Sequence, residues 1–239
     1  MKKFVTAFAA GVATVFGLFA ATYEVADSTE LVTAVANAGA GDEIVLLEGS
    51  YTVSAPLTLA AGADMRGATG DWKGVTITSG QACALLTMQK GSTVSKITFA
   101  DGKGHGVEMH GGVLENCRVT GCVRAGNHAF GVGVYNDNGQ VLGCLIDGNQ
   151  GQDHFTGAGI YQQGADALID RCVITNNPSA RAYGNRNGTD GRLGLGAALK
   201  GGTISNSLVA WNAITKCEAA NFVNASGVAL YGGSMVNCT

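Results

Sequence analysis

The sequence predicts an all-β fold, a parallel β-helix of stacked coils with a short capping helix at its N-terminal end. Three observations predict it. A short unit built around a cysteine recurs along the chain, its apolar residues lie two positions apart, and the steps between units vary while their cores stay alike. One unit is too small to bury its own apolar face, so we expect the units to stack into a continuous core.

The repeat aligns on one position, which is occupied in turn by Cys117, Cys144, Cys172, Ser207 and Cys238. An apolar residue lies three places before each of them, and Val or Ile lies two places after the first four. A spacing of two puts side chains on one face of a strand. The steps between units range from 27 to 35 residues. This variation places the extra residues in loops at one corner and favours a β-helix over a blade repeat.

The cysteine position predicts an inward site that is too tight for a large side chain. We expect Cys117, Cys144 and Cys172 to be buried free thiols, because equivalent residues on neighbouring strands lie about 4.8 Å apart. The Cβ atoms of a disulfide lie about 3.8 Å apart. A single bridge stays open for the cysteines outside this position, which are Cys83, Cys122 and Cys217. Zinc needs convergent ligands at short spacing, and the spacing Cys117-x4-Cys122 alone does not predict a zinc site.

A second recurring position lies five places after the first and holds Cys122, Asn149, Asn177 and Asn212. Asn favours turns, and stacked amides can hydrogen-bond along a column. The sequence therefore predicts a ladder of Asn side chains at a turn.

A helix is predicted upstream of the repeats, between two short strands. Asp27 or Ser28 is suited to cap its N-terminus, and Glu30 lies in its first turn. Leu31, Val35 and Ala38 fall on one face. We expect this helix to cover the edge of the first coil.

Two groups of segments carry a family resemblance: "ELVTAVANAGAGDEIVLLEGSYTV…LTLAAGADMRG", and the repeats "GVGVY…GCLIDGN" and "GAGIY…DRCVITNN". They resemble the right-handed parallel β-helix proteins of the pectin-lyase-like class over about residues 22–239. The resemblance implies a right-handed helix. The resemblance does not indicate a particular activity, because that class includes lyases, hydrolases, adhesins and surface proteins of unknown role.

Residues 1–21 are predicted to be a signal peptide, with Lys2 and Lys3 before an apolar stretch and Ala20-Ala21 at the cleavage point. The alternative is an uncleaved membrane anchor. No second stretch is long and apolar enough to span a bilayer, so we expect a mature chain without a membrane span, secreted or on the cell surface. Its net charge of −3 indicates no general affinity for nucleic acid.

The last residues, "GGSMVNCT", stop in mid-unit without the polar cap that normally ends a repeat array. Residues 22–239 are therefore predicted to form one β-helix domain with three interpretations of its end. The domain is truncated, it is a fragment of a longer surface protein, or it is half of an end-to-end dimer.

Catalytic patterns are incomplete. A Gly-His-Gly around His105 occurs in β-helix polygalacturonases, but the Asn-Thr-Asp and Asp-Asp segments of that family are missing here, and glycoside hydrolysis uses two carboxyls. We expect His105 to be a solvated turn residue. A calcium site like that of polysaccharide lyases is possible but unsupported, because the candidate acids fall at different offsets from the cysteine position: Asp137, Asp147, Asp153, Asp166 and Asp170. No cofactor is predicted.

The longest loop of each unit follows the Asn position. These loops carry aromatic, His and Arg residues, and His128 and His154 are 26 residues apart, as are Gly133 and Gly159. Aromatic faces stack on sugar rings and Arg pairs with carboxylate or sulfate. The predicted ligand site comprises His128, His154, Arg181, Tyr183, Arg186 and Arg192, with Phe130 and Phe155 close by. The alternative is loop padding, in which the two Phe residues pack under their loops.

Two functions follow as hypotheses. The first is a non-catalytic, adhesin-like surface module whose partner is an acidic polysaccharide or a surface protein. The second is a polysaccharide lyase or glycoside hydrolase that acts on an acidic polysaccharide.

Overall fold

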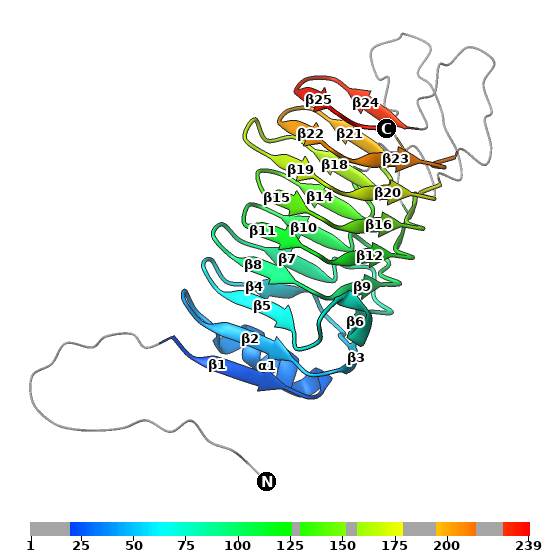
Figure 1. Cartoon of the computed structure of the whole chain (residues 1–239). Coiled ribbons are helices and arrows are strands. Elements are labelled where there is room, and N and C mark those ends of the chain that lie inside the picture. The colour runs from blue at the N-terminus through cyan, green and yellow to red at the C-terminus, as the bar shows by residue number, and fades with distance from the viewer. Residues whose placement is uncertain (1–19, 126–129, 152–156, 179–194, 214–226) are drawn as a thin grey trace, which may run out of the picture.

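The computed structural model describes residues 20–125, 130–151, 157–178, 195–213 and 227–239. They form an elongated stack of coils that runs from β1 near the N-terminus to β25 near the C-terminus (Figure 1). Each complete coil contributes one strand to each of three sheets, which we name A, B and C in the order in which the chain meets them, and β1 and β25 add a strand to sheet A at the two ends. Neighbouring strands are parallel, as in β15 with β19 and β16 with β20. The predicted all-β parallel β-helix is confirmed.

Sheet A contains nine strands of the described chain: β1 (Thr22–Val25), β2 (Glu43–Leu46), β5 (Asp64–Gly67), β8 (Thr93–Ser95), β11 (Val113–Glu115), β15 (Gln140–Leu142), β19 (Leu168–Asp170), β22 (Thr203–Ser205) and β25 (Ser234–Val236). Sheet B contains seven within the same described ranges: β3 (Gly49–Thr52), β6 (Val75–Thr78), β9 (Thr98–Ala100), β12 (Arg118–Thr120), β16 (Leu145–Asp147), β20 (Val173–Thr175) and β23 (Leu208–Ala210).

Sheet C also has seven strands among the described residues: β4 (Leu57–Leu59), β7 (Leu86–Met88), β10 (Val107–Met109), β14 (Val134–Asn136), β18 (Ile160–Gln162), β21 (Ala197–Leu199) and β24 (Val228–Leu230). A further pair, β13 (Val123–Arg124) and β17 (Gln150–Gly151), lies between sheets B and C. A 3₁₀ turn, η1 (Trp72–Gly74), precedes β6.

The core is built from columns of equivalent residues, because the parallel register places like positions on top of one another. The middle residues of the sheet A strands point inward and include Val94, Leu114, Val141 and Ile169, all fully buried. In sheet B the matching column includes Phe99, Val119, Ile146 and Ile174. These are the positions that the spacing of two residues predicts to face the interior.

The cysteine column lies at the turn from sheet A to sheet B. The backbone N–H of Val173 donates to the carbonyl of Cys144 (2.9 Å), and that of Leu208 to the carbonyl of Cys172 (2.9 Å), so these units are neighbours. Cys117, Cys144 and Cys172 are buried free thiols, as predicted. Cys83 and Cys122 are also free, whereas Cys217 lies outside the described residues.

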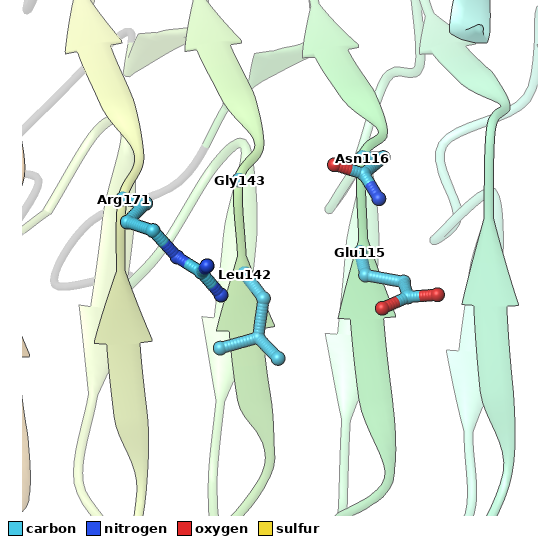
Figure 2. Close-up of a pocket in the computed structure, with 5 residues that line it drawn as sticks. All are labelled: Glu115, Asn116, Leu142, Gly143 and Arg171. Carbon is cyan, nitrogen blue, oxygen red and sulfur yellow. The ribbon is translucent and has the colours of Figure 1, made fainter.

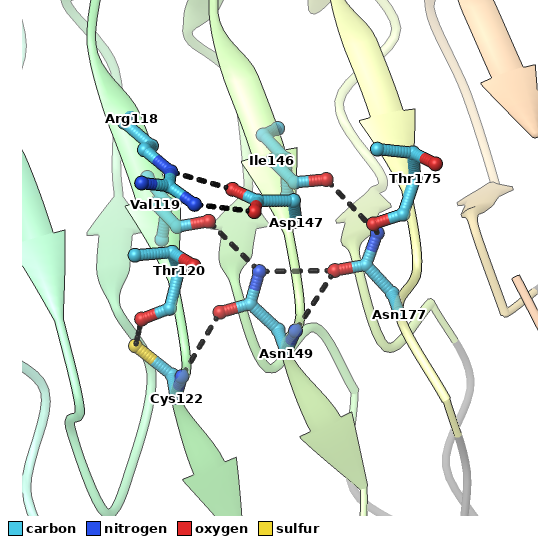
Figure 3. Close-up of polar contacts among 9 residues, drawn as sticks. All are labelled: Arg118, Val119, Thr120, Cys122, Ile146, Asp147, Asn149, Thr175 and Asn177. Carbon is cyan, nitrogen blue, oxygen red and sulfur yellow. Dashed lines mark hydrogen bonds and ion pairs between the residues drawn. The ribbon is translucent and has the colours of Figure 1, made fainter.

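The predicted Asn ladder is confirmed at the turn that follows sheet B (Figure 3). Nδ2 of Asn149 donates to Oδ1 of Asn177, and Nδ2 of Asn177 donates to Oδ1 of Asn212, each at 3.0 Å. The column begins at Cys122, whose backbone N–H donates to Oδ1 of Asn149 (3.1 Å). The three Asn side chains are buried, so the ladder supplies partners for polar groups that water does not reach.

Helix α1 (Ser28–Asn37) covers the first coil (Figure 1). The Asp27 carboxylate accepts hydrogen bonds from the backbone N–H groups of Thr29 (2.8 Å) and Glu30 (2.9 Å). The Glu30 carboxylate accepts in turn from the N–H of Ala26 (2.9 Å), the residue before the N-cap, and so satisfies one more backbone donor at this end of the helix. The helix packs on β1 to β4 through its buried residues Leu31, Ala34 and Val35. The predicted cap and covering role are confirmed.

Across the described ranges, no helix combines the length and the apolar character needed to cross a membrane.

Candidate functional site

The predicted ligand-site residues lie outside the described residues: His128, His154, Arg181, Tyr183, Arg186 and Arg192, and with them Phe155. In the chain they fall on connections from sheet B to sheet C. Their role therefore stays a prediction. The described residues on the first of these connections include Arg124, Phe130 and Gly131, and Tyr135 follows them in β14.

His105 packs at the same corner, and the expectation that it is a solvated turn residue is wrong. It is partly buried just before β10, and its ring lies 5.5 Å from that of Tyr135, centroid to centroid. The Gly-His-Gly segment has a packing reason, because a Cβ atom at Gly106 would lie 2.3 Å from Cγ1 of Val119. The sequence around His105 thus reflects a close approach of two coils.

The His105 imidazole holds the Arg124 guanidinium. Nη1 of Arg124 lies 2.6 Å from Nε2 of His105 and donates to the Phe130 carbonyl at 3.2 Å. Nδ1 of His105 is hydrogen-bonded to the carbonyl of Gly131, a residue whose φ of 55° favours glycine. One tautomer satisfies both contacts: Nδ1–H donates to Gly131, and Nε2 accepts from Arg124.

Burial sets the charge state of this pair. Desolvation, and next the charge of Arg124, lower the pKa of His105 to about 4, against the opposing effect of the Gly131 hydrogen bond. His105 is therefore neutral at neutral pH. Burial also lowers the pKa of Arg124, and the Glu108 carboxylate partly reverses that shift. The guanidinium stays charged, because arginine does not lose its proton in proteins.

Aromatic rings continue from His105 along the outer face of sheet C. Tyr135 stacks on Tyr161 with ring centroids 5.6 Å apart, and Phe130 lies 4.6 Å from Tyr161. The strand register places Glu108, Tyr135 and Tyr161 in one outward column. Tyr161 is only 4% exposed, whereas Glu108 and Tyr135 are partly exposed. We call the group formed by His105, Glu108, Arg124, Phe130 and Tyr135 the sheet C site.

Arg124 differs from the other described arginines in its partners. Arg66 pairs with Glu43 (2.6 Å), Arg118 with Asp147 (2.7 Å) and Arg171 with Asp170 (2.8 Å). Arg124 is half-buried and has no carboxylate within ion-pair distance in the described part of the chain. It is held instead by a neutral ring and a carbonyl. A partly desolvated cation of this kind is a favourable partner for an external anion.

A pocket of about 220 Å³ lies at another corner, where sheet A turns into sheet B, lined by Glu115, Asn116, Leu142, Gly143 and Arg171 (Figure 2). Asn116, Gly143 and Arg171 follow β11, β15 and β19, and each has a positive φ. Because Gly143 has no side chain, the column of side chains between Asn116 and Arg171 is interrupted there. The pocket is this gap. Its cation, Arg171, is already paired with Asp170, so the sheet C site is the stronger candidate.

Three of the five candidate calcium ligands, Asp137, Asp147 and Asp170, have other partners. Both carboxylate oxygens of Asp147 accept hydrogen bonds from Arg118 (2.9 and 2.7 Å; Figure 3). Asp170 accepts from Ser205 (2.7 Å), and Asp137 accepts from Gln163 (2.8 Å). Asp153 lies outside the described residues. In the described ranges no three His, Cys, Asp or Glu side chains are grouped as a metal would need.

Sequence comparison decides the family. A family profile described as "Right handed beta helix region" matches residues 61–239. The chain belongs to this family. The right-handed β-helix expected from the resemblance is thus shown, including its handedness. No curated protein matches the chain in sequence.

Solved structures similar to this β-helix share little sequence with it. A pectin methylesterase mutant in complex with a hexasaccharide is 14% identical with a TM-score of 0.48, over 87% of this chain and 68% of the other. Pectin methylesterase PemA from Erwinia chrysanthemi is 11% identical with a TM-score of 0.48, over 85% and 68%. An alginate lyase from Paenibacillus sp. str. FPU-7 is 12% identical with a TM-score of 0.42, over 90% and 97%. The function of this β-helix has to be argued from its own side chains.

Sequence reasoning missed His105, Glu108 and Arg124 as members of one site. Arg124 and Tyr135 lie at the two ends of the segment that contains His128, a residue of the predicted ligand site. Of the residues of the sheet C site, only Phe130 was predicted to lie near the ligand site.

Proposed function

We propose that this right-handed β-helix binds an acidic polysaccharide at the sheet C site and does not cleave it. The observation that carries the proposal is Arg124, a half-buried cation with no carboxylate partner among the described residues. A uronate carboxylate would supply that partner through charge-assisted hydrogen bonds.

The neighbours of Arg124 support a sugar ligand. The partly exposed ring of Tyr135 offers aromatic contact area to a sugar ring, and the Glu108 carboxylate can accept hydrogen bonds from sugar hydroxyls. A carboxylate beside the cation also favours a ligand of spaced charges, one per sugar, over a dense polyanion, because like charges repel at close range.

A binding role without cleavage is supported by the state of His105. Both of its ring nitrogens are engaged, one with Gly131 and one with Arg124, so the imidazole has no lone pair left to take a proton from a ligand. The proposed setting is that of an exported, adhesin-like surface module, whose signal peptide is removed near residue 21. N-terminal sequencing of the exported protein tests that cleavage.

A second candidate function, glycoside hydrolysis, is favoured by one observation. The carboxylates of Asp137 and Glu108 both raise the pKa of Tyr135, after the larger effect of burial, so two acids lie near this ring. Hydrolysis uses two carboxyls. Asp137, however, already accepts a hydrogen bond from Gln163.

The test uses polygalacturonate and its fully methyl-esterified form, which share a backbone and differ in charge, with alginate as a second uronate. Affinity electrophoresis of the purified protein is expected to show retardation by at least one uronate polymer and none by the ester. Equal retardation by acid and ester, or none by any uronate, rejects the proposal. Overnight incubation with the same polymers and a reducing-end assay separates binding from cleavage; new chain ends would favour the hydrolase or lyase instead.

A further inference from the structure

The Arg124 guanidinium is anchored through one nitrogen. Its five N–H groups can serve several acceptors, and Nη1 is directed at His105 and at the Phe130 carbonyl. Its Nε and Nη2 atoms have no hydrogen-bond acceptor in the described part of the chain. This leaves a planar edge that matches the two oxygens of a carboxylate.

The anchor works only if Nε2 of His105 carries a lone pair. A neutral imidazole has one acceptor nitrogen, whereas a protonated imidazole has two donors. Protonation would place an N–H of His105 against an N–H of Arg124 across a 2.6 Å contact. The contact would then be repulsive in both charge and hydrogen bonding.

We propose that His105 is a positioning residue, whose neutral imidazole fixes the Arg124 guanidinium and leaves its Nε–Nη2 edge for a carboxylate ligand. The proposal deepens the polysaccharide-binding function and rests on it for the ligand, but the His105–Arg124 contact exists without one. Holding a long side chain in place before binding avoids part of the entropy that binding would otherwise cost.

The charged and titratable groups around the pair come from three strands. Arg124 of β13 acts directly on His105. Glu108 of β10 acts on Arg124, and Tyr135 of β14 contacts the imidazole ring. Asp137, after β14, acts on Tyr135. Since the pKa of His105 is about 4, the contact should persist at neutral pH and be lost in acid.

The experiment follows the Arg124 side chain by NMR in ¹⁵N-labelled protein, in wild type, His105→Phe and His105→Gln. Phe keeps the ring and removes both nitrogens, whereas the Gln amide retains an acceptor that does not titrate. In wild type at pH 7 we expect the Arg124 Nε–H signal of a side chain held in one conformation. As the pH falls through about 4, we expect this signal to become that of a side chain averaged over many conformations. In His105→Phe we expect the Arg124 side chain to be conformationally averaged at every pH, and in His105→Gln we expect it to be ordered at every pH. Backbone amide signals of β14 monitor the fold.

An Arg124 signal that is equally ordered in His105→Phe, or that stays ordered in folded wild type at pH 3, overturns the proposal. In a binding titration with polygalacturonate at pH 7, His105→Phe should bind about 3- to 10-fold more weakly than wild type, and His105→Gln within about twofold. If wild type binds no uronate but the NMR results hold, the proposed function fails while the positioning role stands.

Discussion

Nδ2 of Asn149 donates to Oδ1 of Asn177 at 3.0 Å, across two neighbouring coils. The same Oδ1 accepts from the backbone N–H of Asn149 at 3.1 Å. Nδ2 of Asn177 reaches the carbonyls of Ile146 (2.9 Å) and Thr175 (3.0 Å). One buried amide therefore satisfies backbone and side-chain groups of two coils at the turn between sheets B and C.

Replacing Asn177 by Ala should destabilise the protein by about 2–4 kcal/mol. The substitution removes the acceptor of two buried donors of Asn149, its backbone N–H and its Nδ2, and each unsatisfied buried group costs about 1–3 kcal/mol. Asn176→Gly is the matched control. Asn176 is exposed and has a φ of 53°, a conformation that glycine adopts without strain. Urea unfolding should show a lower midpoint for Asn177→Ala and a wild-type or higher midpoint for Asn176→Gly. Equal midpoints in Asn177→Ala and wild type would show that the ladder contributes nothing.

The cysteine column should reject a larger side chain and accept a hydroxyl. Cys144→Leu should cost about 1–3 kcal/mol through overpacking. Cys144→Ser should stay within about 1 kcal/mol of wild type, because Ser207 shows how a hydroxyl is accommodated in this column. Its Oγ donates to the Ser205 carbonyl (2.6 Å) and accepts from the N–H of Cys172 (3.0 Å). A Ser variant less stable than the Leu variant in urea unfolding would contradict this account.

Alkaline pH should weaken the fold through its buried thiols. Burial raises the pKa of Cys117 and of Cys122 to about 12, against about 8.5 in an unfolded chain. The unfolded state then loses protons first, so the stability from these thiols is complete below about pH 8.5 and is lost as the pH rises toward 12. Between pH 8 and pH 10.5 the free energy of unfolding should fall less in Cys117→Ala than in wild type. Identical losses in the two proteins would refute the assignment.

The sequence predicts the contacts that depend on recurring or nearby residues. The Cys144 and Asn177 positions recur at fixed offsets in successive units. In a parallel stack, such equivalent positions contact one another in neighbouring coils. Asp27 and Glu30 predict the helix cap because a cap depends on residues three apart. Such local or periodic relationships can be recognised in the amino-acid sequence alone.

The contact between His105 and Arg124 has neither property. His105 precedes β10, Arg124 lies in β13, and the position of His105 is taken by Val132 in the next coil. No repeat carries the pair, and its formation depends on the Gly131 carbonyl and on burial at the corner. The Gly-His-Gly pattern suggested either catalysis or a solvated turn, and the structure shows a packed residue that holds a neighbour.

Tyr135 should contribute to ligand binding through its aromatic ring and not through its hydroxyl. Tyr135→Ala should weaken binding of a uronate polymer about 5- to 10-fold, in line with about 1 kcal/mol or more from one aromatic contact. Tyr135→Phe should bind within about twofold of wild type. Isothermal titration calorimetry measures both. Equal weakening by the two substitutions would assign the effect to the hydroxyl, against the stacking role.

Arg124→Gln compared with Arg171→Gln is the most direct measurement of the central claim. Each substitution removes one positive charge from the chain. Arg124 lacks a carboxylate partner among the described residues, whereas Arg171 is paired with Asp170 at the corner between sheets A and B. Titration of polygalacturonate at fixed ionic strength should show Arg124→Gln binding about 10- to 100-fold more weakly than wild type, the effect of losing a hydrogen bond to a charged group of about 1.5–3 kcal/mol. Arg171→Gln should bind like wild type. Equal affinities in the two variants would contradict the assignment of the site to the outer face of sheet C.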